Sequence, residues 1–230
     1  VEFAESKEGA SQSAKRPWDP VTDYYLMGRN TSNFSSLWYS LKPTIAKVRG
    51  YAVAGGSDIA LSCDIVIMGE NAKIGYPPAR VWGIPTTMMW ITRVGAEWAK
   101  RMLFTGQLIT GKKAESIGLI SECCPEAELD ARVDALAQYV AAVPKNQLAM
   151  SKMVVNNAID LQGLPQSQML ATIFDGIARH SPEGVAFKKR SEEVGFHVAV
   201  KERDSGKPIF PEAAKKFHRF EDSARRKSNL

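Results

Sequence analysis

A glycine-rich segment near residue 50 has the residue types and spacing to do chemistry. It reads GYAVAGGSDIA from Gly50 to Ala60. It follows a β-type run at 44–48 and continues into an apolar helix expected to end near 63–64. Glycine permits close approach of a ligand to the backbone. The first N–H groups of a helix lack intrahelical partners and lie at the positive end of its dipole. The segment therefore predicts a turn whose backbone N–H groups can hold a carbonyl oxygen that becomes negative during a reaction. The alternative is a tight strand-to-helix turn without chemistry.

Asp58 is the acid/base group of this segment, three positions after Gly55. A carboxyl group there could move a proton to or from a bound ligand. It could equally complement the helix dipole or accept hydrogen bonds from backbone amides. We keep both interpretations, and for nearby Asp64 we favour a structural role in fixing a turn.

The elements around this segment predict an α/β fold. We expect a loop at 6–23, because Ser, Gly, Lys and Pro are frequent there, and a helix at 23–41 that ends before Pro43. Two short apolar runs, 64–68 and 72–75, predict strands. The order strand, turn, helix, strand indicates a mostly parallel sheet with crossover helices.

The second half of the sequence is predicted to be helical. Apolar residues at Leu129, Val133, Leu136 and Val140 mark one face of a helix over 128–143. Thr110 and Ser181 are expected to cap further helices. The expected helical segments are 86–104, 111–117, 128–143, 146–160, 166–180 and one that begins at 181–183. This region should pack on the sheet or on a neighbouring subunit.

Composition limits the class of protein. The 230 residues suit one domain, or one domain with an appendage, and 44% are hydrophobic and 24% charged. The net charge of +5 gathers near the C-terminus, where we favour a solvated tail over a site for a polyanion; no nucleic-acid motif accompanies it. The three cysteines, Cys63, Cys123 and Cys124, favour a reducing, cytoplasmic setting without a disulfide framework or metal site. No apolar run is long enough to span a membrane, and no signal peptide is visible.

Several ordered blocks resemble the enoyl-CoA hydratase/isomerase (crotonase) family. They are 42–64, 72–78, 83–85, 103–109 and 114–120, within a likeness that extends from about 42 to about 196. The resemblance implies a crotonase-like (ClpP/crotonase) α/β fold: a parallel-sheet core at 1–125, a helical C-terminal trimerisation region at 126–205 and a basic tail at 206–230. We expect the core to lack the family's first strands, through either an incomplete sequence or a true truncation. A homotrimer or hexamer is implied as well.

The same resemblance implies an acyl-CoA thioester as ligand and a lyase-type reaction in fatty-acid metabolism. Gly55 matches one of two backbone donors to the thioester oxygen; the other belongs to an earlier loop of the family. Asp58 occupies the position of the first catalytic glutamate, and Pro78 that of the second. Such an enzyme needs no metal ion or redox cofactor, because coenzyme A enters as part of the substrate.

Four further residues are candidates for substrate binding. Tyr76, Arg80 and Trp82 follow the predicted strand at 72–75, and Phe187 lies in the family's terminal helical segment. Packing explains Tyr76 and Trp82 as well, salt bridging explains Arg80, and an ordinary helix face explains the segment around Phe187.

Pro78 keeps two other functions open. Proline has no proton to give or take, so a different crotonase reaction, such as isomerisation, decarboxylation or thioester hydrolysis, is the first alternative. The second is a catalytically silent acyl-CoA-binding or scaffold protein.

Overall fold

The structure of the chain, a computed structural model, describes residues 18–207. Its helices and strands follow one another as α2 (Pro20–Tyr39), β1 (Ile45–Val48), β2 (Tyr51–Val53), α3 (Gly55–Ser62), β3 (Ile65–Gly69), β4 (Lys73–Gly75), η1 (Pro77–Arg80), α4 (Met89–Thr105), β5 (Ile109–Thr110), α5 (Gly111–Ser116), β6 (Glu122–Cys124), η2 (Glu126–Glu128), α6 (Leu129–Ala141), α7 (Lys145–Asp160), α8 (Leu164–His180), α9 (Pro182–Val194) and α10 (Phe196–Asp204).

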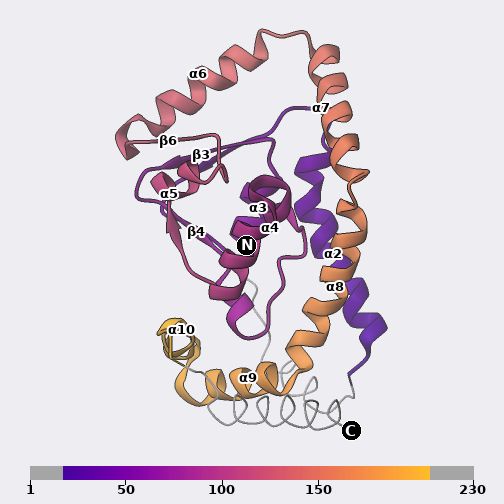
Figure 1. Cartoon of the computed structure of the whole chain (residues 1–230), viewed down its shortest axis with the longest axis vertical. Coiled ribbons are helices and arrows are strands. Elements are labelled where there is room, and N and C mark those ends of the chain that lie inside the picture. The colour runs from indigo at the N-terminus through magenta and orange to yellow at the C-terminus, as the bar shows by residue number, and fades with distance from the viewer. Residues whose placement is uncertain (1–17, 208–230) are drawn as a thin grey trace, which may run out of the picture.

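The chain forms a core of short strands and helices beside a long column of helices (Figure 1). The column consists of α7 followed by α8, and α9 and α10 turn away at its lower end. Although far apart in sequence, α2 and α8 pack against each other, and α2 also packs on α3. The first half of the chain therefore supplies the strands, and the second half covers one side of them.

The strands form two small sheets. The first has the order β1-β3-β6 and is parallel throughout, with Ile45 opposite Ile65 in the β1–β3 pair. The second has the order β2-β4-β5; β2 and β4 are parallel, whereas β5 runs antiparallel to β4. The predicted α/β fold with a largely parallel sheet is confirmed. The sequence did not predict β2, β5 or β6, each of which has only two or three residues.

Gly50 separates the two sheets. Its φ of +68° is in the left-handed region, and its carbonyl accepts a 2.7 Å hydrogen bond from the N–H of Lys73. The chain turns there from β1 in the first sheet to β2 in the second. The run at 44–48 therefore does not lead directly through the glycine-rich turn to the helix, because residues 51–53 form β2 and pair with β4.

The start of the described chain also differs from the prediction. Helix α2 begins at Pro20, and Asp19 caps it by accepting hydrogen bonds from the N–H groups of Val21 and Thr22. Proline suits the first turn of a helix, so the loop predicted for 6–23 is wrong over 20–23. The rest of that loop, the expected start inside the domain and the basic tail beyond residue 207 lie outside the described residues.

The helical predictions are otherwise confirmed. Thr110 and Ser181 each accept a hydrogen bond from a first-turn N–H, at 3.2 and 3.1 Å. The expected stripe on α6 packs on the parallel sheet, where Leu129 and Val133 contact Ile67 and Cys124 in one buried cluster. The larger core cluster lies between the two sheets and α4; its fully buried side chains include Leu61, Met68, Ile74, Trp90 and Met102. Within residues 18–207, no helix combines the length and apolar character needed to cross a membrane.

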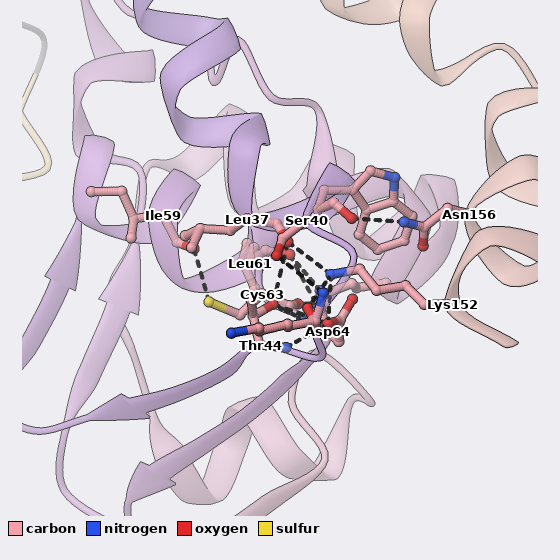
Figure 2. A network of polar contacts seen from close by, with 12 residues as sticks. Leu37, Ser40, Thr44, Ile59, Leu61, Cys63, Asp64, Lys152 and Asn156 are labelled. Atoms are coloured by element: carbon pink, nitrogen blue, oxygen red, sulfur yellow. Dashed lines mark hydrogen bonds and ion pairs between the residues drawn. The ribbon is translucent and has the colours of Figure 1, made fainter. Parts of the chain in front are cut away.

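Polar contacts join α7 to the core (Figure 2). The ammonium group of Lys152 pairs with Asp64 at 2.8 Å and donates to the carbonyls of Leu37 and Lys42 at 2.9 and 3.1 Å. Asp64 also accepts hydrogen bonds from the N–H and the hydroxyl of Thr44. Asp64 therefore has the structural role expected from the sequence, and Lys152 uses three donors to connect α7, α2 and the start of β1.

Replacement of Lys152 tests this connection. We expect Lys152→Met to lower the free energy of unfolding by about 3 kcal/mol, because it leaves the carboxylate of Asp64 without its cation in a largely buried place. Urea unfolding of the two proteins would measure the change. Lys145→Met, at an exposed position of the same helix, is the control and should change the value by less than about 0.5 kcal/mol. Equal losses in both variants would contradict the prediction.

Candidate active site

The corner at Ala54 orients the start of α3. Ala54 has a φ of 53°, unusual for a residue with a side chain, and its N–H donates to the carbonyl of Gly75 at 3.2 Å. Its own carbonyl accepts from the N–H groups of Ser57 and Asp58. Within residues 18–207 the N–H of Gly55, first in the helix, has no hydrogen-bond acceptor. The corner therefore leaves a helix N-terminal donor available to a ligand.

Asp58 is one turn further along α3 and is only 2% exposed. The hydroxyl of Thr87 donates to its carboxyl group at 2.5 Å. Burial raises the pKa of Asp58 to about 7; the negative charge of Asp175 adds to the rise, and the hydrogen bonds from Thr87 oppose it. A carboxyl group with such a pKa can donate or accept a proton near neutral pH.

A cavity of about 250 Å³ joins most of the predicted site residues. Gly55, Asp58, Tyr76 and Trp82 all border it, and so does Pro78. Helix α2 contributes Met27, Asn30 and Phe34 to its wall. The structure thus brings together four of the six residues that the sequence singled out.

Tyr76 is buried, and its hydroxyl donates to the carbonyl of Ile84 at 3.0 Å. Burial is the largest of the causes that raise the pKa of this phenol, and the carboxyl groups of Asp58 and Asp175 add to it. Tyr76 therefore stays protonated and supports the loop at 83–87 on the cavity wall.

Arg80 and Phe187 do not border this cavity. The guanidinium of Arg80 donates to the carbonyls of Arg203 and Thr105, at 2.8 and 2.9 Å, and forms no salt bridge within the described part of the chain. Phe187 is 1% exposed and packs behind Trp82, with ring centroids 5.2 Å apart. Their predicted contact with substrate stays a prediction, and their contacts here connect α9 and α10 to the core.

Two charged residues of the cavity wall were not identified from the sequence: Asp175 and Arg179, both on α8. Asp175 is 6% exposed, forms an ion pair with Arg179 and accepts a 3.0 Å hydrogen bond from the N–H of Ile84. An ordinary charged pair at i and i+4 on a helix faces solvent, so its spacing alone gave no reason to place it in a site.

A longer pattern on α8 could have revealed the pair. Gln168, Thr172, Asp175 and Arg179 follow the spacing i, i+4, i+7 and i+11, which places them on one face. Gln168 donates to the carbonyl of Thr87 at 3.0 Å, and the hydroxyls of Thr172 and Thr31 are 3.1 Å apart. The polar face of α8 is turned inward, while Leu170, Ile173, Phe174 and Ile177 are exposed.

No histidine or cysteine of the described chain borders this cavity. His180 stacks on Trp18 at the end of α8, with ring centroids 4.6 Å apart, and His218 lies outside the described residues. Cys63 is buried, and all three cysteines are free. No group of three His, Cys, Asp or Glu side chains is placed to hold a metal ion in the part of the chain that the structure describes.

Comparison with known proteins places this geometry in a family. The model of the family described as enoyl-CoA hydratase/isomerase matches residues 20–192. A putative enoyl-CoA hydratase of Thermus thermophilus is 33% identical over 156 residues, covering 65% of this chain and 61% of its own length. The 2,3-dehydroadipyl-CoA hydratase of Escherichia coli is 31% identical over 171 residues, covering 68% and 66%.

Solved structures of proteins named as enoyl-CoA hydratases have a similar fold. An enoyl-CoA hydratase from Mycobacterium smegmatis superposes with a TM-score of 0.82 at 49% identity, covering 87% of this chain and 70% of the other. An enoyl-CoA hydratase/isomerase from Xanthobacter autotrophicus gives 0.78 at 27% identity, covering 86% and 75%. The chain spans about half to two thirds of the length of the curated relatives it matches.

The raised pKa of Asp58 has a consequence for stability. An unfolded Asp ionises near 3.9, so the folded chain holds this proton more tightly, and the free energy of unfolding should fall as pH rises from about 4 through 7. Asp58→Asn keeps an acceptor for Thr87 but cannot ionise. We expect the variant to be more stable than wild type at pH 8.5, by up to about 4 kcal/mol at 1.36 kcal/mol per pKa unit. Thermal unfolding at pH 4.5 and 8.5 would measure this difference; a difference independent of pH would contradict it.

Proposed function

Because the chain belongs to the enoyl-CoA hydratase/isomerase family, we propose that it processes acyl-CoA thioesters by stabilising a thioester enolate. The observation that carries this proposal is a single cavity that joins the unpaired N–H of Gly55, within the described residues, to the buried carboxyl group of Asp58. The reaction is hydration of an enoyl-CoA or a related lyase or isomerase reaction in fatty-acid metabolism.

Gly55 would stabilise the negative charge. As the thioester carbonyl takes on enolate character, its oxygen would accept a hydrogen bond from the N–H of Gly55, supported by the positive end of the α3 dipole. One such donor contributes about 3 kcal/mol to the stability of a transition state. The family's other donor comes from a loop that precedes the matched blocks, and no residue among 18–207 is assigned to it.

Asp58 would move the proton. Near neutral pH its raised pKa keeps a large fraction in the protonated form, which can protonate the α-carbon of an enolate. Tyr76 and Trp82 would shape the acyl pocket, with Arg80 and Phe187 supporting its rim from the side of α9. Coenzyme A would arrive as part of the substrate, and the proposed chemistry needs neither a metal ion nor a redox cofactor.

Pro78 favours one alternative. It borders the cavity at the position where the family resemblance places a second glutamate, and it offers no acid/base group there. This observation is compatible with a catalytically silent acyl-CoA-binding protein that retains the pocket.

Assays on the natural polypeptide distinguish the enzyme from the silent acyl-CoA-binding protein. We expect mass spectrometry of a panel of acyl-CoA and enoyl-CoA esters to reveal turnover, and Asp58→Asn to lower kcat about 10²- to 10⁴-fold while binding persists. Asp134→Asn, an exposed carboxylate on α6, is the control and should leave kcat unchanged. Tight binding of an ester without any turnover would favour the silent protein. Absence of binding would contradict both functions.

We also propose that the apolar face of α7 and α8 is a subunit contact in a homotrimer or hexamer. Val154 and Val155 on α7, and Leu170, Phe174 and Ile177 on α8, are exposed although apolar. A band of this kind along two successive helices is typical of a protein–protein contact.

Light scattering after gel filtration would test the assembly. The wild-type protein should have three or six times its protomer mass, and Phe174→Asp should lower that mass because it places a charge in the contact. A wild-type protein that elutes as a monomer would contradict the proposal.

A further inference from the structure

We propose that Asp175, on α8, is the second carboxyl group of the active site and takes the acid/base role for which Pro78 has no group. This inference rests on the proposed function. Four residues with ionisable or charged side chains border the cavity within residues 18–207: Asp58, Tyr76, Asp175 and Arg179. Tyr76 is held protonated and Arg179 cannot release its proton, so Asp175 is the remaining partner for Asp58.

The two carboxyl groups have opposite surroundings. Asp58 is 2% exposed and receives a side-chain hydrogen bond from one neutral hydroxyl, that of Thr87. Asp175 forms an ion pair with the guanidinium of Arg179 and accepts a hydrogen bond from the N–H of Ile84. Two carboxyl groups whose environments differ in this way can divide the work, one as acid and the other as base.

The position of Asp175 is fixed from several sides. Ile84 donates its N–H to Asp175 and accepts from the hydroxyl of Tyr76, so one residue links the α8 carboxylate to the wall of the cavity. Gln168, two turns earlier on the same face, donates to the carbonyl of Thr87, whose hydroxyl contacts Asp58. The loop at 83–87 therefore holds both carboxyl groups in a common frame. A catalytic carboxylate needs such a frame, because misplacement by about 1 Å can cost 10²-fold in rate.

The proposed step balances for hydration. The carboxylate of Asp175 accepts a proton from water as the water oxygen forms a bond to the β-carbon of the enoyl thioester. The π electrons of the broken C=C bond move toward the thioester oxygen, which the N–H of Gly55 holds as an enolate. When the enolate collapses, the α-carbon takes the proton of the Asp58 carboxyl group. Solvent then returns one proton to Asp58 and removes one from Asp175.

The principal test is Asp175→Asn in the natural polypeptide. The variant keeps an oxygen that can accept from the N–H of Ile84, so the loop retains its contact while the base is lost. With an enoyl-CoA turned over by the wild type, we expect kcat to fall about 10²- to 10⁴-fold. The double variant Asp58→Asn/Asp175→Asn should be less than tenfold slower than the slower single variant, since paired catalytic groups are not additive. Asp134→Asn is again the control.

The pH profile separates a base from a structural residue. The groups that face Asp175 are Arg179 on its own helix, Asp58 on α3, Tyr76 after β4 and, beside Gly176, Asp23 on α2. We expect Asp175→Asn to remove the acidic limb of the kcat/KM profile, because that limb reports protonation of the base. The affinity for acyl-CoA should stay close to wild type.

Restoring a carboxyl group at the proline position gives an independent readout. Pro78→Glu in the Asp175→Asn background should recover at least tenfold of the lost kcat, because the new side chain enters the same cavity. If Asp175→Asn does not fold, Asp175→Glu keeps the ion pair and displaces the carboxylate: a lower kcat with unchanged binding supports the inference, and an unchanged kcat overturns it.

Two failures can be told apart. A wild-type protein that is active while Asp175→Asn stays within threefold of its kcat, with the same pH profile, overturns the role of Asp175 alone. A wild-type protein that binds esters and converts none overturns the proposed function, and the role of Asp175 with it.

Discussion

The site depends on the backbone corner at Ala54. A residue with a side chain adopts a positive φ there, which costs of the order of 1–3 kcal/mol, and it does so only because both of its backbone groups are bonded. Its N–H extends the pairing of β2 with β4, and its carbonyl accepts from the second and third N–H groups after Gly55. These bonds fix the start of α3, whose first amide has no acceptor within residues 18–207, and Asp58 borders the same cavity one turn later.

The second half of the chain completes this site from outside. Helix α8 turns Gln168, Thr172, Asp175 and Arg179 inward and exposes apolar side chains, the reverse of the usual arrangement for a helix on the surface of a monomer. The inward side chains satisfy backbone groups of the loop at 83–87, which has few partners of its own. The inner face of α8 is therefore polar because it bonds this loop. The apolar outer face suits the subunit contact that we propose.

Stability and chemistry make opposite demands on Asp58. A carboxyl group that is 2% exposed and hydrogen-bonded by one hydroxyl resists ionisation, so the folded chain is less stable at high pH than it would be with a neutral side chain. The same resistance keeps a proton available near neutral pH. Lys152 and Asp64 are charged groups buried in a different way, as an ion pair. Every donor of the Lys152 ammonium group has a partner, so the pair stabilises the fold, and neither residue borders the cavity.

The sequence by itself determined the family, the parallel α/β core, the caps at Thr110 and Ser181, and Gly55, Asp58, Tyr76 and Trp82 as neighbours. These features are local: each depends on residues within a few positions or on one ordered block. Only the tertiary structure decided that Arg80 and Phe187 lie behind the cavity and that Asp175 and Arg179 border it. A side chain on α8 reaches Asp58 through the packing of α8 on α2 and on the loop at 83–87, and sequence spacing contains no record of which distant surfaces meet.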